Sequence, residues 1–176
     1  MARESRLAEF ACQFQCELFL FSPIPTDDGV ELFHAVSHHK FPRALPLAVI
    51  TSVDEAEYWC KNRVKEWHSG ECFVWTCRRL GEEKTIGQVT LLPQSGGLAL
   101  AYWVNPKSWG QGLATHMCQS LISHLGQSGY KGQIKAGVHD WNLRSESVLC
   151  KLGFTQKSVS DSPDTKTFTL FVNSLE

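Results

Sequence analysis

The chain has 176 residues, 43% hydrophobic and 20% charged, which is typical of a globular protein and excludes a disordered chain. Its 17 Lys and Arg against 18 Asp and Glu give a net charge of −1, so no overall positive field exists to attract nucleic acid. The sequence has no apolar run of membrane-spanning length, and its first ten residues lack the apolar core of a signal peptide. We therefore expect one cytoplasmic domain over residues 1–176, with no membrane or nucleic-acid partner.

The first part of the chain shows patterns of a strand and a short helix. Alternating Phe and Cys side chains predict a strand over residues 10–21. A short helix is expected near 27–38, with Val30, Phe33 and His34 on one face. Residues 39–51 hold two prolines and predict an irregular loop or short turn.

A capping box then begins a longer helix. Ser52 and Glu55 stand three positions apart, so each side chain can satisfy a free N–H at the helix start, and Gly70 ends the helix. Extended runs with short turns between them predict an antiparallel meander over Cys72–Arg79, Thr85–Leu92 and Leu98–Val104.

The last part of the chain alternates helices with strands. The helices are expected over 111–126 and Asn142–Leu152, and the strands over Ile134–His139, Phe154–Ser160 and Thr167–Val172. The whole pattern predicts an α/β (α+β) fold, with a mixed, mostly antiparallel sheet and helices on both faces.

The stretch from Ala101 to Met117 joins a strand to a helix through a loop that contains Gly110 and Gly112. The first N–H groups of a helix lack partners inside it, and the helix dipole is positive there. Glycines let a phosphate approach those groups, so we predict that a pyrophosphate binds here. The loop has neither the P-loop lysine nor the three glycines of a dinucleotide fingerprint, so an ordinary strand-to-helix turn is the alternative.

The seven cysteines are scattered along the chain and include no C-x-x-C pair. Together with the seven histidines they give no zinc-binding spacing. We expect reduced, mostly buried thiols and no metal site.

Two segments taken together resemble a known family. They are Tyr102-Trp103-Val104-x-Pro106-x-x-Trp109-Gly110-Gln111-Gly112-Leu113-Ala114-Thr115 and Asn142-x-x-Ser145-x-x-x-Leu149-x-Lys151-Leu152-Gly153-Phe154. In this order and spacing they resemble the GNAT superfamily of N-acetyltransferases, and within it the branch that contains ribosomal-protein N-terminal acetyltransferases. The resemblance covers roughly residues 10–160 and implies a sheet in which two neighbouring strands splay apart.

The resemblance implies that acetyl-CoA, the acyl donor, lies between the splayed strands. Its pantetheine arm would bond to the backbone of Tyr102, Trp103 and Val104 and would contact Asn142, which otherwise only caps its helix. Its pyrophosphate would bind the loop and helix start formed by Trp109, Gly110, Gln111, Gly112, Leu113, Ala114 and Thr115. The backbone N–H near Val104 is a candidate for stabilising the oxyanion.

The family's usual acid and base are missing here. Ala99 stands where many members carry a glutamate base, and Leu149 stands where many carry a tyrosine acid. The candidates for acid–base work are Ser145, Asp164 or else Asp161, and His139. Each of these residues could instead have no catalytic role. Ser145 could simply be a serine in the first turn of a helix, the aspartate a solvated turn residue, and His139 a histidine at the end of a strand.

The acceptor implied by the resemblance is a primary amine, which must be neutral to attack. An α-amine costs about 1 kcal/mol to deprotonate at pH 7, whereas a lysine costs about 4–5 kcal/mol, so a site without a strong base favours an α-amine or a small-molecule amine. The alternatives are a non-catalytic acyl-CoA sensor on the same fold, or an unrelated module that binds ATP or NAD. The chain is expected to be a monomer or a homodimer.

Overall fold

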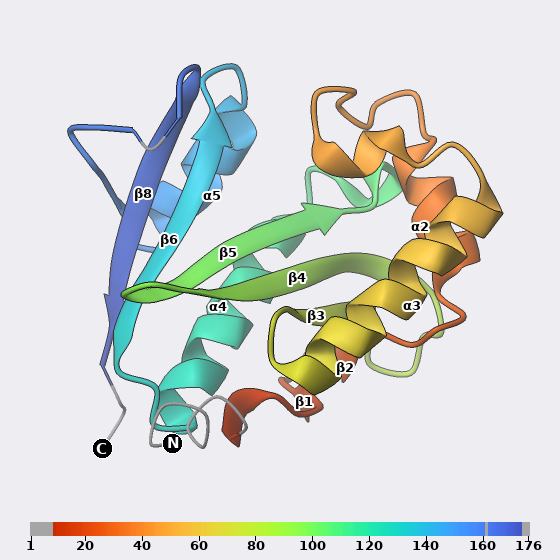
Figure 1. The fold of residues 1–176 in the computed structure, drawn as a ribbon, viewed down its shortest axis with the longest axis horizontal. Coiled ribbons are helices and arrows are strands. Elements are labelled where there is room, and N and C mark those ends of the chain that lie inside the picture. The colour runs from red at the N-terminus through yellow and green to blue at the C-terminus, as the bar shows by residue number, and fades with distance from the viewer. Residues whose placement is uncertain (1–8, 161, 174–176) are drawn as a thin grey trace.

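The computed structural model describes residues 9–160 and 162–173, and within them eight strands form one sheet with helices on both faces (Figure 1). The strands are Phe14–Gln15 (β1), Phe19–Pro23 (β2), Phe73–Arg79 (β3), Thr85–Gln94 (β4), Gly97–Val104 (β5), Gly132–His139 (β6), Thr155–Gln156 (β7) and Thr165–Val172 (β8). The helices are Gly29–Val36 (α2), Val53–Ser69 (α3), Leu113–Gln127 (α4) and Leu143–Lys151 (α5), with 3-10 turns at Pro46–Val49 (η1) and Pro106–Ser108 (η2). The predicted mixed, mostly antiparallel sheet is confirmed.

The sheet is split at the junction of β5 and β6. The strand order is β1-β2-β3-β4-β5-β6-β8-β7, and in the described part the pairs are antiparallel except for β5 with β6. The parallel pairing ends where Ala99 lies opposite Lys135, and beyond it the two strands diverge into a V that opens upward in Figure 1. At the closed end, a Cβ on Gly97 would collide with the carbonyl oxygen of Gln133, so only glycine allows this close approach.

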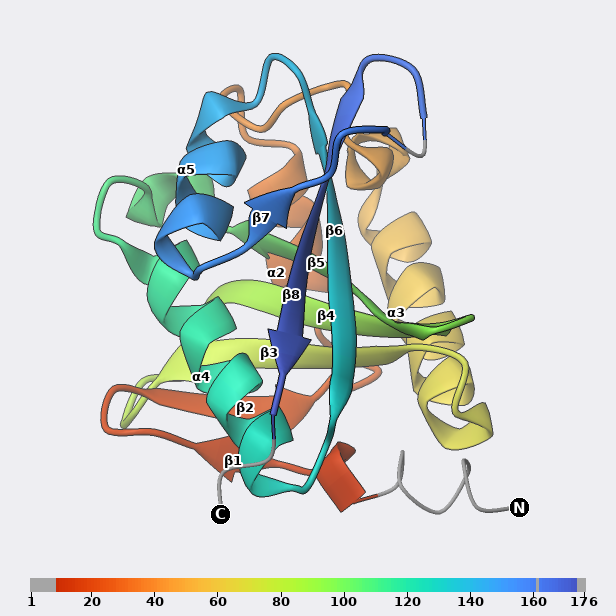
Figure 2. The ribbon, with the colours of Figure 1, turned by 90° about the vertical axis from the view of Figure 1, so that its left-hand side faces the viewer.

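Two hydrophobic cores lie on opposite faces of the sheet. Helices α4 and α5 cover one face and α2 and α3 cover the other (Figure 2). On β5, Leu100 belongs to the core beneath α4, whereas Trp103 belongs to the core beneath α2 and α3. Strand β6 likewise buries alternate residues beneath α4, so the intervening ones lie on the opposite face. These intervening residues are Lys135, Gly137 and His139.

The capping box at the start of α3 is confirmed in a slightly different form. Ser52 Oγ accepts a hydrogen bond from the Glu55 N–H at 3.2 Å, as expected. The Glu55 carboxylate reaches one residue further back and accepts from the N–H and the hydroxyl of Thr51, at 2.6 and 3.0 Å. These bonds, first of all that from the Thr51 N–H, lower the pKa of Glu55. Gly70 ends the helix in the left-handed conformation, with φ 75°.

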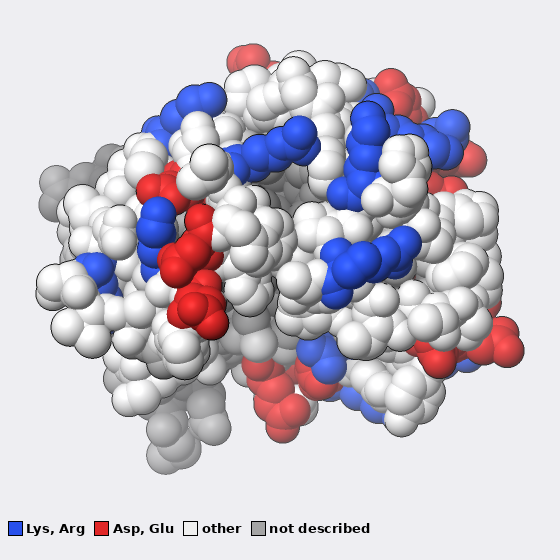
Figure 3. Space-filling view, turned by 90° about the horizontal axis from the view of Figure 1, so that it is seen from above, with Lys and Arg blue, Asp and Glu red and all other residues white. Residues whose placement is uncertain are grey.

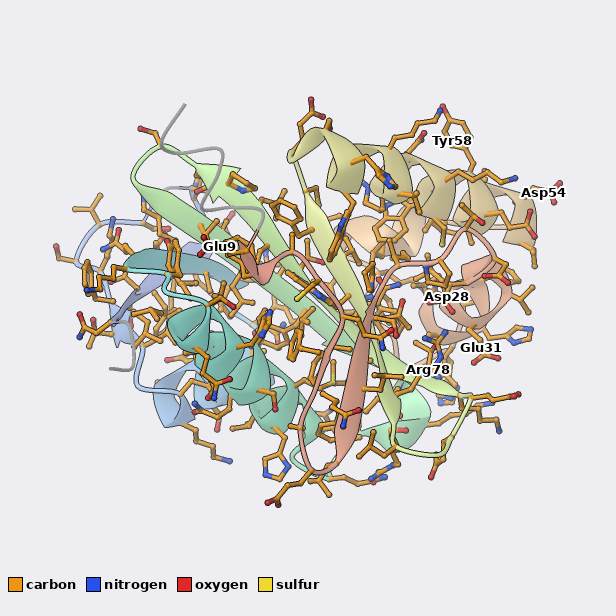
Figure 4. All side chains as sticks on the ribbon, turned by 90° about the horizontal axis from the view of Figure 1, so that it is seen from below. Glu9, Asp28, Glu31, Asp54, Tyr58 and Arg78 are labelled. Atoms are coloured by element: carbon orange, nitrogen blue, oxygen red, sulfur yellow. The ribbon has the colours of Figure 1, made fainter. Side chains whose placement is uncertain are left out.

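Buried Asp28 ties α2 to the sheet. Its carboxylate accepts hydrogen bonds from Thr76 Oγ1 at 2.7 Å, from Arg78 Nη2 at 2.9 Å and from Thr85 Oγ1 at 3.3 Å. Figure 4 shows the Asp28 and Arg78 side chains close together. The side chain is 4% exposed, so the ion pair is largely removed from water and depends on these neutralising contacts.

The sequence-based prediction was wrong in three places. Residues 10–21 do not form one strand, because the chain turns back after Phe14–Gln15 and pairs with its own continuation as β1 and β2. Helix α2 buries Leu32 and Val36 and leaves Val30 43% exposed, because the bonds made by Asp28 fix how the helix is rotated on the sheet. The strand expected over Phe154–Ser160 is limited to β7, since β8 offers it only two paired positions.

The thiols agree with expectation. All seven cysteines are free, and four of them are buried. Burial raises the pKa of Cys60 to about 12, which keeps this thiol protonated at neutral pH. In the described part of the chain, none of the helices has both the length and the apolar character of a membrane span. Of the N-terminal segment tested for a signal peptide, residues 1–8 lie outside the described residues.

Candidate active site

The loop between β5 and α4 presents a run of unpaired backbone N–H groups. Gly110 and Gly112 have φ of 82° and 71°, a conformation that glycine adopts without steric cost. Gly112 is the N-cap of α4 and supplies no side chain to bond the first turn. Among the described residues, the N–H groups of residues 110–115 donate no hydrogen bond, whereas the His116 N–H bonds to the Gly112 carbonyl at 3.2 Å. These free donors at a helix start fit an anion such as a pyrophosphate.

The Trp109 side chain braces this loop. Its indole Nε1 donates to the Val104 carbonyl at 2.8 Å, and the Arg144 guanidinium lies 4.7 Å from the centre of its ring. The ring therefore connects the end of β5 with the start of α5, across the open end of the V. These side-chain contacts account for a tryptophan at position 109, the first position of the loop. A contact between the Trp109 backbone and a pyrophosphate stays a prediction.

Arg79 brings a positive charge to the loop from β3. Its Nη2 donates to Gln111 Oε1 at 2.7 Å, so the guanidinium is held beside the free N–H groups. Sequence reasoning missed Arg79, because it lies far from the loop in sequence and only the fold brings them together. A coarser signal was available, since the chain contains no Asp or Glu between Glu83 and Asp140, the stretch that forms the loop and both arms of the V. A polyanionic cofactor is consistent with that absence.

Tyr102 connects the two sides of the V. Its hydroxyl lies 2.7 Å from Ser145 Oγ and donates to the Ser145 carbonyl at 3.3 Å. Burial raises the pKa of Tyr102 above its ordinary value, so the phenol stays protonated at any working pH. Asn142 Oδ1 caps α5 by accepting from the Ser145 N–H at 3.2 Å, and its Nδ2 has no partner among the described residues. The cap is therefore confirmed, and contact between Asn142 and a pantetheine arm stays a prediction.

A groove of about 250 Å³ lies on the other face of the split. It is lined by residues of β4, β5, β6 and β8 and of the turn before β8, among them Ala99, Lys135, Gly137, His139 and Thr165. Helices α2 and α3 cover this face over β3 and β4 and leave it open over β6 and β8 (Figure 2). The groove thus reaches the closed end of the V from the side opposite α4 and α5.

The three predicted acid–base residues fall in different surroundings. His139 lines the groove, and its ring stacks on Trp141 with centroids 5.4 Å apart. Ser145 lies on the α4–α5 side, against Tyr102. Asp164 is exposed in a turn with φ 57°, and it meets the end of β6 through its carbonyl, which accepts from the Asp140 N–H at 3.1 Å. Among the described residues no hydrogen bond joins the three, and Asp161 lies outside the described residues.

Positive charge gathers at the open end of the V. Figure 3 looks onto this end and shows a central hollow with Lys and Arg side chains around much of its rim and acidic side chains gathered to its left. Desolvation first, and then the nearby charges of His39, Lys107 and Lys40, lower the pKa of His38.

Comparison with known proteins agrees with this geometry. The solved structures that match the fold include RimL, a ribosomal L7/L12 alpha-N-protein acetyltransferase in complex with coenzyme A, at TM-score 0.75 and 12% identity over 90% of this chain and 97% of that one. They include the ribosomal-protein-S5-alanine acetyltransferase of Vibrio fischeri, at TM-score 0.74 and 16% identity over 93% of this chain and 98% of that one. They also include MccE, the microcin C7 self-immunity acetyltransferase in complex with acetyl-CoA and AMP, at TM-score 0.77 and 14% identity over 89% of this chain and 94% of that one.

At sequence identities this low, structural similarity shows only that the fold is shared. The assignment to a family must come from sequence comparison. A sequence comparison with curated proteins gives no significant match. The family model for the acetyltransferase (GNAT) domain, however, matches residues 19–155, which include both motifs and every strand from β2 to β6. The chain therefore belongs to the GNAT acetyltransferase family.

Proposed function

We propose that this acetyltransferase transfers the acetyl group of acetyl-CoA directly to a neutral α-amine, at a protein or peptide N-terminus or on a small molecule. The proposal is carried by the free N–H groups of residues 110–115, which lie where β5 and β6 diverge. Acetyl-CoA would place its pyrophosphate on these donors and its pantetheine arm along β5 in the gap left by β6.

The amine would approach from the groove. Its nitrogen forms a bond to the thioester carbonyl carbon, the C–S bond breaks, and coenzyme A leaves as a thiolate. His139, which lines the groove, would take the proton from the nitrogen. Ser145, on the α4–α5 side and bonded to Tyr102, would pass a proton to the leaving sulfur and take one back from water, so that its hydroxyl is restored. Asp164 makes no side-chain hydrogen bond in the described part of the chain, so its role rests on the family resemblance alone.

The lack of a strong base favours the α-amine over lysine. Ala99 lines the groove where many family members carry glutamate, and among the described lining residues Lys135 and His139 are the titratable ones. A histidine can accept a proton from an α-amine with pKa about 7.7–8.0, whereas a lysine amine near 10.4 costs about 4–5 kcal/mol to neutralise at pH 7.

A binding and turnover experiment tests the proposal. Calorimetric titration with acetyl-CoA, ATP and NAD should give binding of acetyl-CoA alone. Thiol release is then measured with peptides that carry free N-termini, with the same peptides blocked at the N-terminus but bearing an internal lysine, and with small amines. We expect turnover on free α-amines. Turnover confined to the lysine peptides would overturn the α-amine assignment, and tight binding without turnover on any amine would favour the sensor.

A further inference from the structure

We propose that the acceptor carries a carboxylate close to its reacting amine, and that Lys135 binds this carboxylate in the groove. The inference rests on the proposed function, because it assigns an acceptor to the same site. It commits to a carboxylate rather than a phosphate because the described part of the groove lining offers a single ammonium and no arginine fork.

Among the described residues, Lys135 is the lysine of a groove lining that contains no carboxylate. Besides Lys135 and His139, the lining residues that the structure describes are uncharged. Within the described part of the chain, no acidic side chain lies within ion-pairing distance of the Lys135 ammonium. The other lysine of the β strands at this edge, Lys166, is by contrast paired with Glu146 at 2.7 Å. Lys135 is half-buried, so a ligand charge beside it would be only partly screened by water.

The position of Lys135 in the sheet fixes how far the carboxylate is from the amine. Lys135 lies opposite Ala99 in the last register pair before β5 and β6 part. In the proposed reaction the thioester reaches the groove near this closed end of the V. Lys135 and His139 stand four residues apart on the same face of β6, so the attacking nitrogen would lie between the ammonium and the imidazole. The favoured acceptor therefore has its carboxylate within about one residue of its amine, as in an acidic peptide N-terminus or a small amino acid derivative.

Matched acceptors separate charge from shape. The peptide arm compares Ser-Glu-Gln-Gln-Gln-Gln with Ser-Gln-Gln-Gln-Gln-Gln and with Ser-Gln-Gln-Gln-Gln-Glu, which moves the charge away from the amine. The small-molecule arm compares glutamic acid α-amide with glutamine α-amide. For the wild-type protein we expect kcat/KM about tenfold higher for the acceptor with the near carboxylate, a difference of about 1.4 kcal/mol. The arm that shows it identifies the source of the carboxylate.

Variants of Lys135 complete the test. Lys135→Gln should remove the preference, and Lys135→Glu should reverse it toward Ser-Lys-Gln-Gln-Gln-Gln, while the KM for acetyl-CoA stays unchanged. Lys131→Gln is the control, because Lys131 is exposed just before β6 begins and does not line the groove. A wild-type protein that does not distinguish the matched acceptors, or a Lys135→Gln variant that keeps the preference, overturns the inference.

A second measurement separates this inference from the proposed function. The same acceptors are titrated into protein saturated with desulfo-coenzyme A, and their Kd values are compared without any turnover. A preference in Kd that depends on Lys135 supports the carboxylate site even if no amine is acetylated, which would count only against the proposed function. Equal Kd values for charged and uncharged acceptors count against the carboxylate site even if both are acetylated.

Discussion

The Tyr102 hydroxyl on β5 lies 2.7 Å from the Ser145 hydroxyl in the first turn of α5, and this contact joins the two sides of the cleft. Tyr102 stays protonated, and either hydroxyl can be the donor in this contact. When Tyr102 donates to Ser145 Oγ, the Ser145 proton is free to move to another acceptor. In the proposed reaction that acceptor is the sulfur of coenzyme A.

Replacement of Ser145 separates this role from simple packing. Ser145→Ala should lower kcat about 10- to 100-fold and leave the KM for acetyl-CoA unchanged, because a general acid acts in the transition state. Ser145→Thr keeps a hydroxyl and should recover most of the rate. Tyr102→Phe is the structural control, and it should cost about 1 kcal/mol of stability for the lost hydrogen bond. An unchanged kcat in Ser145→Ala would remove this residue from the mechanism.

A carboxylate in the loop should prevent cofactor binding. Gly112→Glu puts a negative charge among the free N–H groups, and two like charges about 4 Å apart cost several kcal/mol at a protein surface, so we expect Kd for acetyl-CoA to rise more than about 100-fold. Gly129→Glu is a matched control, because Gly129 also has positive φ and open space around its Cα. Both variants carry the same left-handed strain, about 1 kcal/mol, so equal effects on Kd would rule out the loop as the pyrophosphate site.

The guanidinium of Arg79 should contribute to the same binding step. Arg79→Gln removes the charge next to Gln111, and we expect Kd for acetyl-CoA to rise about 5- to 20-fold at low salt. The loss should shrink as salt is added, since the missing term is electrostatic. Lys84→Gln, in the exposed turn after β3, serves as the control for net charge. A Kd unaffected by Arg79→Gln at low salt would mean that this arginine only orients the Gln111 side chain.

The Asp28 contacts predict a loss of stability without loss of binding. Asp28→Ala leaves the Arg78 charge and two threonine hydroxyls without their partner, and we expect urea denaturation to show a loss of about 3 kcal/mol. Asp27→Ala, at the exposed neighbouring position, should change stability by less than about 0.5 kcal/mol. The Kd for acetyl-CoA should stay unchanged, because Asp28 lies on the face of the sheet opposite α4. A loss equal to that of Asp27→Ala would show that the buried network contributes little.

The sequence predicted local features well and missed those that depend on the fold. The Ser52 cap and the free N–H groups at Gly110 and Gly112 follow from a few neighbouring residues, and both were found. Arg79 and Lys135 gain their positions from strand pairing with distant partners, so no local pattern marks them. The buried face of α2 was predicted wrongly for the same reason, because its rotation is set by bonds from Asp28 to two other strands.

The short pairing of β5 with β6 also leaves this sheet with an edge inside it. Most proteins protect the unpaired peptide groups of an outer strand from other chains, whereas here the half of β5 beyond Ala99 turns such groups toward the interior of the cleft. The pantetheine arm of acetyl-CoA, which has two amides of its own, would then take the place of a missing strand and fill the gap between β5 and β6. Cofactor affinity and the completeness of the sheet would thus be coupled in this fold. Any change that lets β5 and β6 pair along their whole length would make the protein more rigid and, by the same change, abolish acetyl-CoA binding and activity.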